Sequence, residues 1–329
     1  MPPGKLGKRI LITGITGFVG SHMADALAEG NWVFGLRHWH RSSVQNVKHI
    51  QDKITWIDCD LTDPISVQNL IEDTQPEEVY HFAAESFVSP SWQHPHAYMR
   101  ANYDVTVNLL ESLFRIVPNT RILIPGSGEE YGEVAEEDLP ITTATPLRPV
   151  NPYAVSKIAQ DLIGMVYYKS CGLPVIRTRS FNTEGPRRAN VFGIPWYAYQ
   201  IASIEAGLQA PVVRVGHTED RRNFTHILDM VQAYQLAMQC CEPGQLYLIG
   251  TQDIHTFKDA LLGLIASSSC KGIAYEQVPE FTRPTQVPRL IADCEPFTQL
   301  TRWKPERNFY DILGDTLEYW RARVLEDAK

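Results

Sequence analysis

Three side chains in the middle of the chain have the chemistry to move a hydride and a proton at an alcohol carbon. Ser127 supplies a hydroxyl, Tyr153 a phenol and Lys157 an ammonium. Tyr153 and Lys157 have Tyr-x-x-x-Lys spacing, so on a helix they project from the same face. A nearby ammonium favours phenolate and lowers the phenol pKa, which makes tyrosine a workable acid or base near neutral pH. The pattern therefore predicts a redox centre.

A carboxylate next to this set would extend its chemistry. Glu129 follows Ser127 by two positions. Once an alcohol has become a ketone, the neighbouring C–H is acidified, and a carboxylate at the same centre can remove that proton. Loss of water can then follow, which is the chemistry of a dehydratase. A purely structural carboxylate is the alternative, and Glu130 is expected to point elsewhere if the segment is extended.

Alternating strands and helices are needed to hold these groups. Short apolar runs predict strands, and the stretches between them predict helices. Such alternation is typical of βαβ units that form a parallel sheet covered on both faces. We predict strands at 9–13, 32–36, 54–57, 78–82, 121–124 and 174–177, and helices at 18–28, 65–73, 98–114, 152–169, 226–238, 256–266 and 310–323.

A glycine-rich turn lies between the first predicted strand and the first predicted helix. It contains Gly14, Gly17 and Gly20. Glycine permits the tight turn, lets the backbone approach a pyrophosphate and allows the helix to pack close to the sheet. The free amides and the helix dipole then face the phosphates. In its strand–turn–helix context this turn predicts a dinucleotide site.

The end of the second predicted strand indicates which dinucleotide binds. A carboxylate there would accept from ribose hydroxyls, but the chain carries Arg37, Arg41 and Ser42. Guanidinium and hydroxyl donors match the oxygens of a 2′-phosphate, so NADP is predicted in preference to NAD. A solvated basic loop is the alternative. Asp60 and Leu61 follow the third strand, where the carboxylate could accept from the adenine amino group or cap the next helix.

We therefore predict an α/β fold, with a Rossmann-type doubly wound parallel sheet and a smaller C-terminal substrate-binding lobe. Residues 1–180 are expected to form the NADP-binding Rossmann domain, including the Ser, Glu, Tyr and Lys of the reaction centre. Residues 181–329 are expected to form mainly the substrate-binding lobe, with some segments returning to the first domain. Arginines gather in this second part, where the strand pattern becomes irregular.

With these features the chain resembles the extended short-chain dehydrogenase/reductase family, and within it the enzymes of GDP-mannose metabolism. Two sibling groups match different segments. The segments Arg37–Ser43, Phe181–Arg188 and Arg283–Val287 are similar to GDP-mannose 4,6-dehydratases. By contrast, Gly126–Gly132 and Leu147–Tyr153 are more similar to GDP-4-keto-6-deoxymannose reductases. The resemblance runs over essentially the whole chain.

Some positions depart from the dehydratase pattern. Ser127 stands where dehydratases usually carry threonine, although a serine hydroxyl can do the same work. Glu85 replaces a glutamine, Thr183 a histidine and Asn223 an aspartate. These departures leave the exact reaction and the substrate open.

The resemblance implies roles for individual residues. A sugar diphosphate carries about two negative charges, which suit charge-assisted and preferably bidentate donors; each arginine involved could instead be a surface residue. Ser127, Glu129, Tyr153 and Lys157 would be catalytic. The cofactor would contact Gly14, Gly17, Gly20, Arg37, Arg41, Ser42, Asp60, Leu61, Ala83, Tyr153, Lys157 and Arg188, and the nucleotide sugar would contact Ser86, Asn182, Arg222 and Arg283.

The implied activity is that of a GDP-mannose 4,6-dehydratase. It would oxidise C4, eliminate water across C5 and C6, and return the hydride to C6 to give a GDP-4-keto-6-deoxy sugar. The alternative is a GDP-4-keto-6-deoxy-D-mannose reductase, which uses Ser127, Tyr153 and Lys157 in the opposite direction and needs no carboxylate. A nucleotide-sugar C4 epimerase and a non-catalytic nucleotide-binding regulator are less favoured. The sequence does not decide which nucleotide base is bound, or whether the sugar is a hexose or a heptose.

Composition limits the partners and the location. A net charge of -8 over 329 residues argues against nucleic acid. No apolar run approaches the ~20 residues needed to cross a bilayer, and the six cysteines lack CxxC spacing, which fits a reducing compartment. No metal site is predicted, because the paired histidines lack further ligands at suitable spacing. We expect a cytoplasmic enzyme without membrane contact, and the resemblance implies a homodimer or homotetramer.

Overall fold

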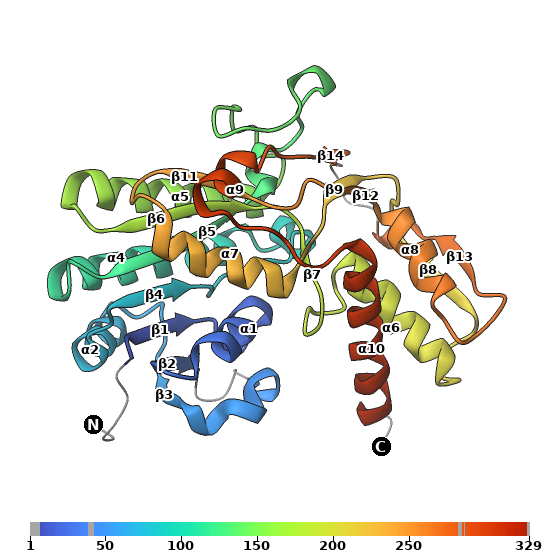
Figure 1. The fold of residues 1–329 in the computed structure, drawn as a ribbon, viewed down its shortest axis with the longest axis horizontal. Helices are drawn as coiled ribbons and strands as arrows, with labels where there is room; N and C mark the ends of the chain where they lie inside the picture. Colours follow the sequence, from blue (N-terminus) through green and yellow to red (C-terminus); the bar gives the residue numbers. More distant parts are fainter. Residues whose placement is uncertain (1–6, 39–42, 282–284, 286, 328–329) are drawn as a thin grey trace.

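A seven-stranded parallel sheet with helices on both faces forms the centre of the molecule (Figure 1). The computed structural model describes residues 7–38, 43–281, 285 and 287–327. The strand order is β11-β6-β5-β4-β1-β2-β3, and neighbouring strands are parallel. The predicted α/β fold with a Rossmann-type sheet is confirmed. The strands are β1 (Arg9–Thr13), β2 (Trp32–Arg37), β3 (Ile54–Asp58), β4 (Glu78–His81), β5 (Arg121–Ser127), β6 (Val175–Ser180) and β11 (Leu246–Ile249).

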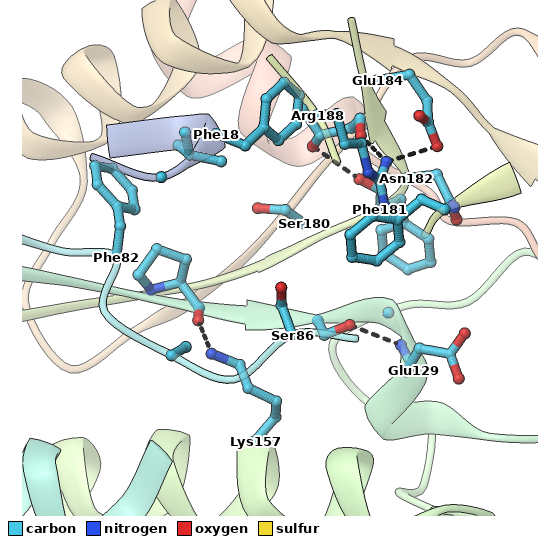
Figure 2. Close-up of a pocket in the computed structure, with 18 of the residues that line it drawn as sticks. Phe18, Phe82, Ser86, Glu129, Lys157, Ser180, Phe181, Asn182, Glu184 and Arg188 are labelled. Carbon is cyan, nitrogen blue, oxygen red and sulfur yellow. Dashed lines mark hydrogen bonds and ion pairs between the residues drawn. The ribbon is translucent and has the colours of Figure 1, made fainter. Parts of the chain in front are cut away.

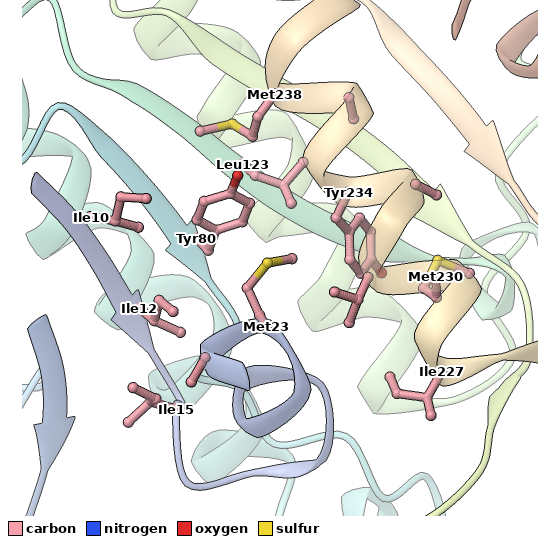
Figure 3. Close-up of a cluster of buried hydrophobic side chains, with 14 of the residues drawn as sticks. Ile10, Ile12, Ile15, Met23, Tyr80, Leu123, Ile227, Met230, Tyr234 and Met238 are labelled. Atoms are coloured by element: carbon pink, nitrogen blue, oxygen red, sulfur yellow. The ribbon is translucent and has the colours of Figure 1, made fainter. Parts of the chain in front are cut away.

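The apolar run of β1 explains the two layers of helices. Successive side chains of a strand point to opposite faces, so Ile10 and Ile12 join one buried cluster and Leu11 joins another. Figure 3 shows the first cluster, where Met23 of α1 and Tyr234 of α7 pack over the sheet. Helices α2, α4 and α5 cover the other face. These helices are α1 (Phe18–Leu27), α2 (Pro64–Thr74), α4 (Val105–Ile116), α5 (Pro152–Cys171) and α7 (Ile227–Cys240).

The chain beyond β6 builds a separate apolar cluster and also returns to the sheet. Helices α6, α8 and α10 pack together around Ile201, Leu261 and Ile312. By contrast, β11 pairs with β6, and α9 packs against β11. The remaining elements of this part are β7 (Thr183–Glu184), α6 (Gly193–Glu205), β8 (Val212–Val215), β9 (Arg221–Asn223), β10 (Thr225–His226), β12 (Ile254–Thr256), α8 (Phe257–Ala266), β13 (Ala274–Gln277), β14 (Arg289–Leu290), α9 (Glu295–Thr301) and α10 (Phe309–Asp327).

The single helix predicted over 98–114 is interrupted in the structure. Helix α3 (Pro95–Met99) leads into a π-helical segment (Arg100–Asp104), and α4 follows it. Asn102 lies in this segment, where its Oδ1 accepts from the Glu85 amide at 2.8 Å and its Nδ2 donates to the Glu85 carbonyl at 3.0 Å. π-bulges of this kind are frequent at functional sites. The spacing of apolar residues in the sequence does not reveal the bulge, because it stays helical in the turns on either side.

The segment after β5 is also different from the prediction. Gly128–Tyr131 forms a 3₁₀ helix and is not extended. Ser127 caps this helix, because its Oγ accepts from the Glu129 amide at 3.2 Å while its own amide donates to Glu130 Oε1 at 2.7 Å. Such reciprocal capping satisfies backbone amides at a helix start. It also turns the two consecutive glutamates toward different surroundings.

A buried ionic network, formed by Glu130, Asp161, Arg177 and Arg179, joins α5 to β6 and to the end of β5. The Asp161 carboxylate on α5 accepts from Arg177 at 2.6 and 2.8 Å and from Arg179 at 2.7 Å. Arg179 also donates to Glu130 at 2.6 Å. All four side chains are buried. Buried charges are tolerated only when they are paired and hydrogen-bonded, so this network fixes how α5 sits on the sheet.

Replacing Arg179 with methionine is expected to destabilise the fold strongly. The change leaves the Glu130 and Asp161 carboxylates buried with fewer partners, which costs about 3–5 kcal/mol in the free energy of unfolding. The matched control, Arg214→Met, removes an exposed pair with Glu276 at 3.1 Å and should cost at most about 1 kcal/mol. Urea unfolding measures both losses. Equal losses in the two variants would show that the network does not hold α5.

Candidate functional site

A cleft of about 490 Å³ opens at the carboxyl ends of β1, β5 and β6. The strand order reverses at β1, because β2 and β3 lie on one side of it and β4 and β5 on the other. Open α/β sheets bind ligands at such a switch point. The predicted catalytic residues Ser127, Glu129, Tyr153 and Lys157 all line this cleft, and Figure 2 shows Glu129 and Lys157 in its wall.

The glycine-rich turn forms one end of the cleft and has the shape that a pyrophosphate requires. Gly14 has φ +66°, and a Cβ on it would lie 2.7 Å from the Ala83 amide nitrogen. A Cβ on Gly20 would lie 2.2 Å from the Gly14 carbonyl oxygen. Gly17 is the N-cap of α1 and gives it no side-chain cap, so the first amides of this helix are available to an anion. The turn therefore fits a dinucleotide, and its three glycines line the cleft.

The basic side chains predicted to select NADP are only partly described. Arg37 ends β2, and its Nε donates to Asp58 of β3 at 2.9 Å. Both side chains are about half exposed, so further guanidinium donors face solvent at this edge of the sheet. Arg41 and Ser42 lie outside the described residues.

Asp60 and Leu61 form the turn after β3. Asp60 Oδ1 accepts from the amide and the hydroxyl of Thr62 at 2.9 and 2.7 Å. The alternative prediction that Asp60 caps the next helix is wrong, because Asp63 is the N-cap of α2 and accepts from the Ile65 amide at 3.1 Å. Asp60 and Leu61 are outside the lining of the described cleft.

Arg188 reaches the cleft from the second part of the chain. Its guanidinium pairs with Glu184 at 2.6 Å, donates to the Thr183 carbonyl and lies 4.2 Å from the centre of the Phe192 ring. Figure 2 shows this pair at the wall opposite Lys157. Burial raises the pKa of Glu184 to about 7, although the charge of Arg188 opposes the rise. The Arg188 guanidinium is thus held at the cleft by the Glu184 carboxyl group, whose pKa is close to neutral pH.

Tyr153 is fixed at the start of α5, close to Ser127. Asn151 caps this helix by accepting from the Ala154 amide at 2.8 Å. Burial has the largest effect on the Tyr153 phenol and raises its pKa above the ordinary value, whereas a hydrogen bond with the Ser127 side chain lowers it. The predicted lowering of this pKa is therefore wrong for the structure, because burial outweighs the groups that favour phenolate. Tyr153 is a phenol at neutral pH and is suited to donate a proton.

Lys157 lies one turn further along α5 and is buried. Its Nζ donates to the Pro125 carbonyl at 2.7 Å and to the Gln160 side chain. Burial is the largest influence and lowers the pKa of Lys157 to about 8, while the charges of Glu130 and Asp161 oppose this shift. The lysine is mainly an ammonium at neutral pH, as the predicted role requires.

The two consecutive glutamates have different surroundings. Glu129 lines the cleft, and its Oε2 accepts from Asn151 Nδ2 at 3.1 Å. Glu130 is fully buried and pairs with Arg179 at 2.6 Å. The prediction that Glu130 points elsewhere is confirmed, although the 3₁₀ turn and not an extended strand separates the two. Asn151 thus connects the cap of α5 to the only one of these glutamates that faces the cleft.

The predicted substrate residues fall into two groups. Ser86 and Asn182 line the cleft together with the catalytic set. Arg222 is buried outside the described lining, where its guanidinium lies 3.6 Å from Asp220 and donates to its neighbour's carbonyl. Arg283 lies outside the described residues. The structure therefore brings two of the four to the cleft wall.

Sequence reasoning missed Ser180 and Tyr234, which also line the cleft. Ser180 is the register partner of Ser127 across β5 and β6, and its Oγ hydrogen-bonds the Tyr234 hydroxyl at 2.6 Å. Ser180 could have been found, since neighbouring parallel strands end at the same edge of a sheet. No local signal marks Tyr234, because it comes from α7 and meets the cleft only through the tertiary fold.

Comparisons with known proteins agree with this geometry. A family model described as GDP-mannose 4,6 dehydratase matches residues 11–316. The GDP-6-deoxy-D-mannose reductase of Pseudomonas aeruginosa is 30% identical, over 97% of this chain and 99% of the relative. GDP-mannose 4,6 dehydratase 1 of Arabidopsis thaliana is 29% identical, over 98% of this chain and 93% of the relative.

Solved structures give the same result. The structure of RMD from Pseudomonas aeruginosa complexed with NADPH is 29% identical, with a TM-score of 0.82 over 96% of this chain and 99% of that one. A UDP-glucose 4-epimerase of Thermus thermophilus complexed with NAD is 25% identical, with a TM-score of 0.84 over 95% and 98%. The motifs, the cleft and the match to the family model lead to one conclusion: the chain belongs to the GDP-mannose 4,6 dehydratase family.

Proposed function

We propose that the protein is an NADP-dependent nucleotide-sugar 4,6-dehydratase that acts on GDP-mannose. The observation that carries this proposal is the position of Glu129, which lines the same cleft as Ser127 and Tyr153. Oxidation at one carbon needs the hydroxyl and the phenol, and elimination at the next carbon needs an additional base. Family membership and the names of several relatives support the same activity.

NADP fits the glycine turn, and when bound it supplies the acceptor and later the donor of the hydride. The Tyr153 phenol first releases its proton to solvent. The phenolate then takes the proton from O4 of the sugar as C4 becomes a ketone, and Ser127 hydrogen-bonds the same oxygen. Lys157 holds a positive charge next to this centre, which favours the phenolate that must form. The raised pKa of Tyr153 makes the phenolate a strong base once it forms and a stable phenol afterwards.

Glu129 carries the elimination. The new ketone acidifies the C5 hydrogen, and the Glu129 carboxylate removes it. The same carboxyl group then gives the proton to the hydroxyl that leaves C6 as water. C5 then takes one proton from solvent, relayed by the Glu129 carboxyl group, and the hydride removed from C4 is returned to C6, so the product is a 4-keto-6-deoxy sugar. Because one side chain serves two adjacent carbons, positioning contributes much of the rate, and the bond from Asn151 at 3.1 Å supplies that positioning.

The second part of the chain supports substrate binding. We propose that residues 1–180 bind NADP and that residues 181–329 contribute mainly to the nucleotide sugar. Asn182 from this part and Ser86 from the sheet domain both line the cleft. Arg222 and Arg283 are proposed to bind the diphosphate, for which a guanidinium is well suited. The buried Arg222 would exchange its contact with Asp220 for this anion.

A reductase is the second candidate, and one observation favours it. The GDP-6-deoxy-D-mannose reductase of Pseudomonas aeruginosa aligns over nearly all of both chains. In this reaction Tyr153 would donate its proton to the oxygen of a C4 ketone. The phenol form found at neutral pH suits that direction, and Glu129 would have only a structural role.

We further propose a homodimer or homotetramer in the cytoplasm. Apolar side chains of α4 and α5 are exposed, among them Phe114, Val155, Leu162 and Val166. Two such helices from each of two subunits would cover these side chains when packed together.

None of the described helices combines the length and the apolar character needed to span a membrane.

Product analysis separates the two candidate reactions. The protein is incubated with GDP-mannose and a catalytic amount of NADP+, and the nucleotide sugars are identified by mass spectrometry. We expect a product lighter than the substrate by one water, with no net change in cofactor absorbance. If GDP-mannose is unchanged, while NADPH is consumed only when the 4-keto-6-deoxy sugar is supplied, the protein is the reductase.

Glu129→Gln tests the carboxylate directly. The amide keeps the size of the side chain but cannot accept the C5 proton, so the rate of dehydration should fall by about 10²–10⁴-fold, the usual contribution of a general acid–base group. The control is Glu133→Gln, which changes an exposed glutamate in the same loop region and should keep full turnover. Full activity of the Glu129 variant would remove this residue from the mechanism.

A further inference from the structure

Gln160 is a buried glutamine on α5 that contacts the ammonium of Lys157. It is 1% exposed. Its Oε1 accepts from Lys157 Nζ, and its Nε2 donates to Thr106 Oγ1 of α4 at 2.8 Å. An ammonium has donors only, so the amide oxygen must face the lysine and the amide nitrogen must face the threonine. Gln160 therefore bridges two helices, and both ends of its amide are used.

The bond directions beyond this glutamine follow from proton counting. Thr106 gives its hydroxyl proton to the Asn102 carbonyl at 2.7 Å, so at 2.9 Å from His81 Nε2 it can only accept. Burial lowers the pKa of His81 to about 3, so the ring is neutral. Because the Thr106 hydroxyl can only accept, the single ring proton lies on Nε2. His81 Nδ1 consequently accepts from the Thr13 hydroxyl at 2.8 Å. One tautomer and one orientation satisfy the whole chain of bonds.

This chain of bonds ends beside the phosphate-binding turn. Thr13 is the residue before Gly14, and its Oγ1 accepts from the Ala83 amide at 3.1 Å. A continuous path of buried polar groups thus joins Lys157 to the first glycine of the turn. Fully bonded buried networks are rigid, and a broken link leaves costly unpaired groups. The lysine and the glycine turn are therefore held by the same network of hydrogen bonds, although they lie on different elements.

We propose that Gln160 is a positioning residue that holds the Lys157 ammonium for the dinucleotide bound in the cleft. The ammonium has three N–H donors. Two are directed to Pro125 and Gln160, so within the described structure one is left for a ligand in the cleft that Lys157 lines. The inference rests on the proposed binding of NADP and concerns how the protein prepares for it.

The charges around Lys157 explain why a neutral acceptor matters here. Glu130, after β5, and Asp161, on α5, favour the ammonium, but both are also bonded to Arg179. From β4 the neutral His81 faces it, and Tyr153 lies one turn away on the same helix. The pKa of Lys157 is lowered to about 8 by burial, so a modest change in its hydrogen bonds moves its protonation across the working range of pH.

The test is the pH dependence of NADPH binding, measured by cofactor fluorescence without any substrate. Affinity of the unmodified protein should fall as the pH rises through the pKa of Lys157, because the ammonium is the donor. Gln160→Met removes the acceptor and should move this fall to lower pH by about one to two units, since a hydrogen bond to a charged group contributes about 1.5–3 kcal/mol. Gln160→Glu adds a negative charge and should move the fall to higher pH.

The matched control is Gln200, another glutamine that is 1% exposed. It lies on α6, where its amide bonds the backbone of Arg214 at 2.8 and 3.0 Å. Gln200→Met and Gln200→Glu should lower thermal stability without moving the pH of the transition. If only one of the two Gln160 variants folds, the direction in which its binding transition moves along the pH scale still tests the proposal.

Two results would overturn the proposal. One is a transition that stays at the wild-type pH in the Gln160 variants, and the other is a shift in the same direction in both. Because no turnover is measured, failure to convert GDP-mannose would count against the dehydratase alone. Failure of the unmodified protein to bind NADPH would reject the cofactor assignment and this inference together.

Discussion

The contact between the Asp161 carboxylate and the two arginines of β6 is the interaction on which the site depends. It fixes α5 against the sheet at a single height, and Tyr153 and Lys157 can then meet the end of β5. Because Arg179 also binds Glu130 at 2.6 Å, the same contact sets the 3₁₀ turn that carries the neighbouring glutamate to the cleft. Burying these charges costs desolvation free energy. The network therefore contributes a unique arrangement of α5 and the sheet more than it contributes net stability. The elements that carry the hydroxyl, phenol, ammonium and carboxylate are thereby joined by one ionic network.

The cleft combines a rigid end and an end that is assembled from distant segments. The glycine turn belongs to the first βα unit, and its tight backbone contacts leave no space for side chains at Gly14 or Gly20. The opposite wall comes from the chain after β6, where Arg188 pairs with Glu184 at 2.6 Å. Under the proposed function, the dinucleotide would bind at the first end and the nucleotide sugar would be held mainly by the chain after β6. Both ligands would then meet at the switch point of the sheet.

Much of this arrangement was predictable from local sequence, and the rest depended on long-range contacts. Apolar runs located six strands of the sheet, and helical spacing placed Tyr153 and Lys157 on one face of α5. The seventh strand, β11, was missed because its pairing with β6 joins residues far apart in the chain. The π-helical segment around Asn102 was missed because it inserts a local irregularity into a regular period. The sign of the Tyr153 pKa shift was wrong because burial is a property of the folded state. Spacing can place an ammonium next to a phenol, but it does not report how deeply both are buried.

The central claim is that a proton leaves C5 of the sugar at this cleft. It is tested most directly by letting the protein convert GDP-mannose in D₂O with catalytic NADP+ and locating deuterium in the recovered sugar by NMR. The account predicts a single solvent deuterium at C5 of the 4-keto-6-deoxy product. Turnover that leaves the C5 hydrogen of the sugar unexchanged would contradict it, because chemistry confined to C4 would then explain the activity.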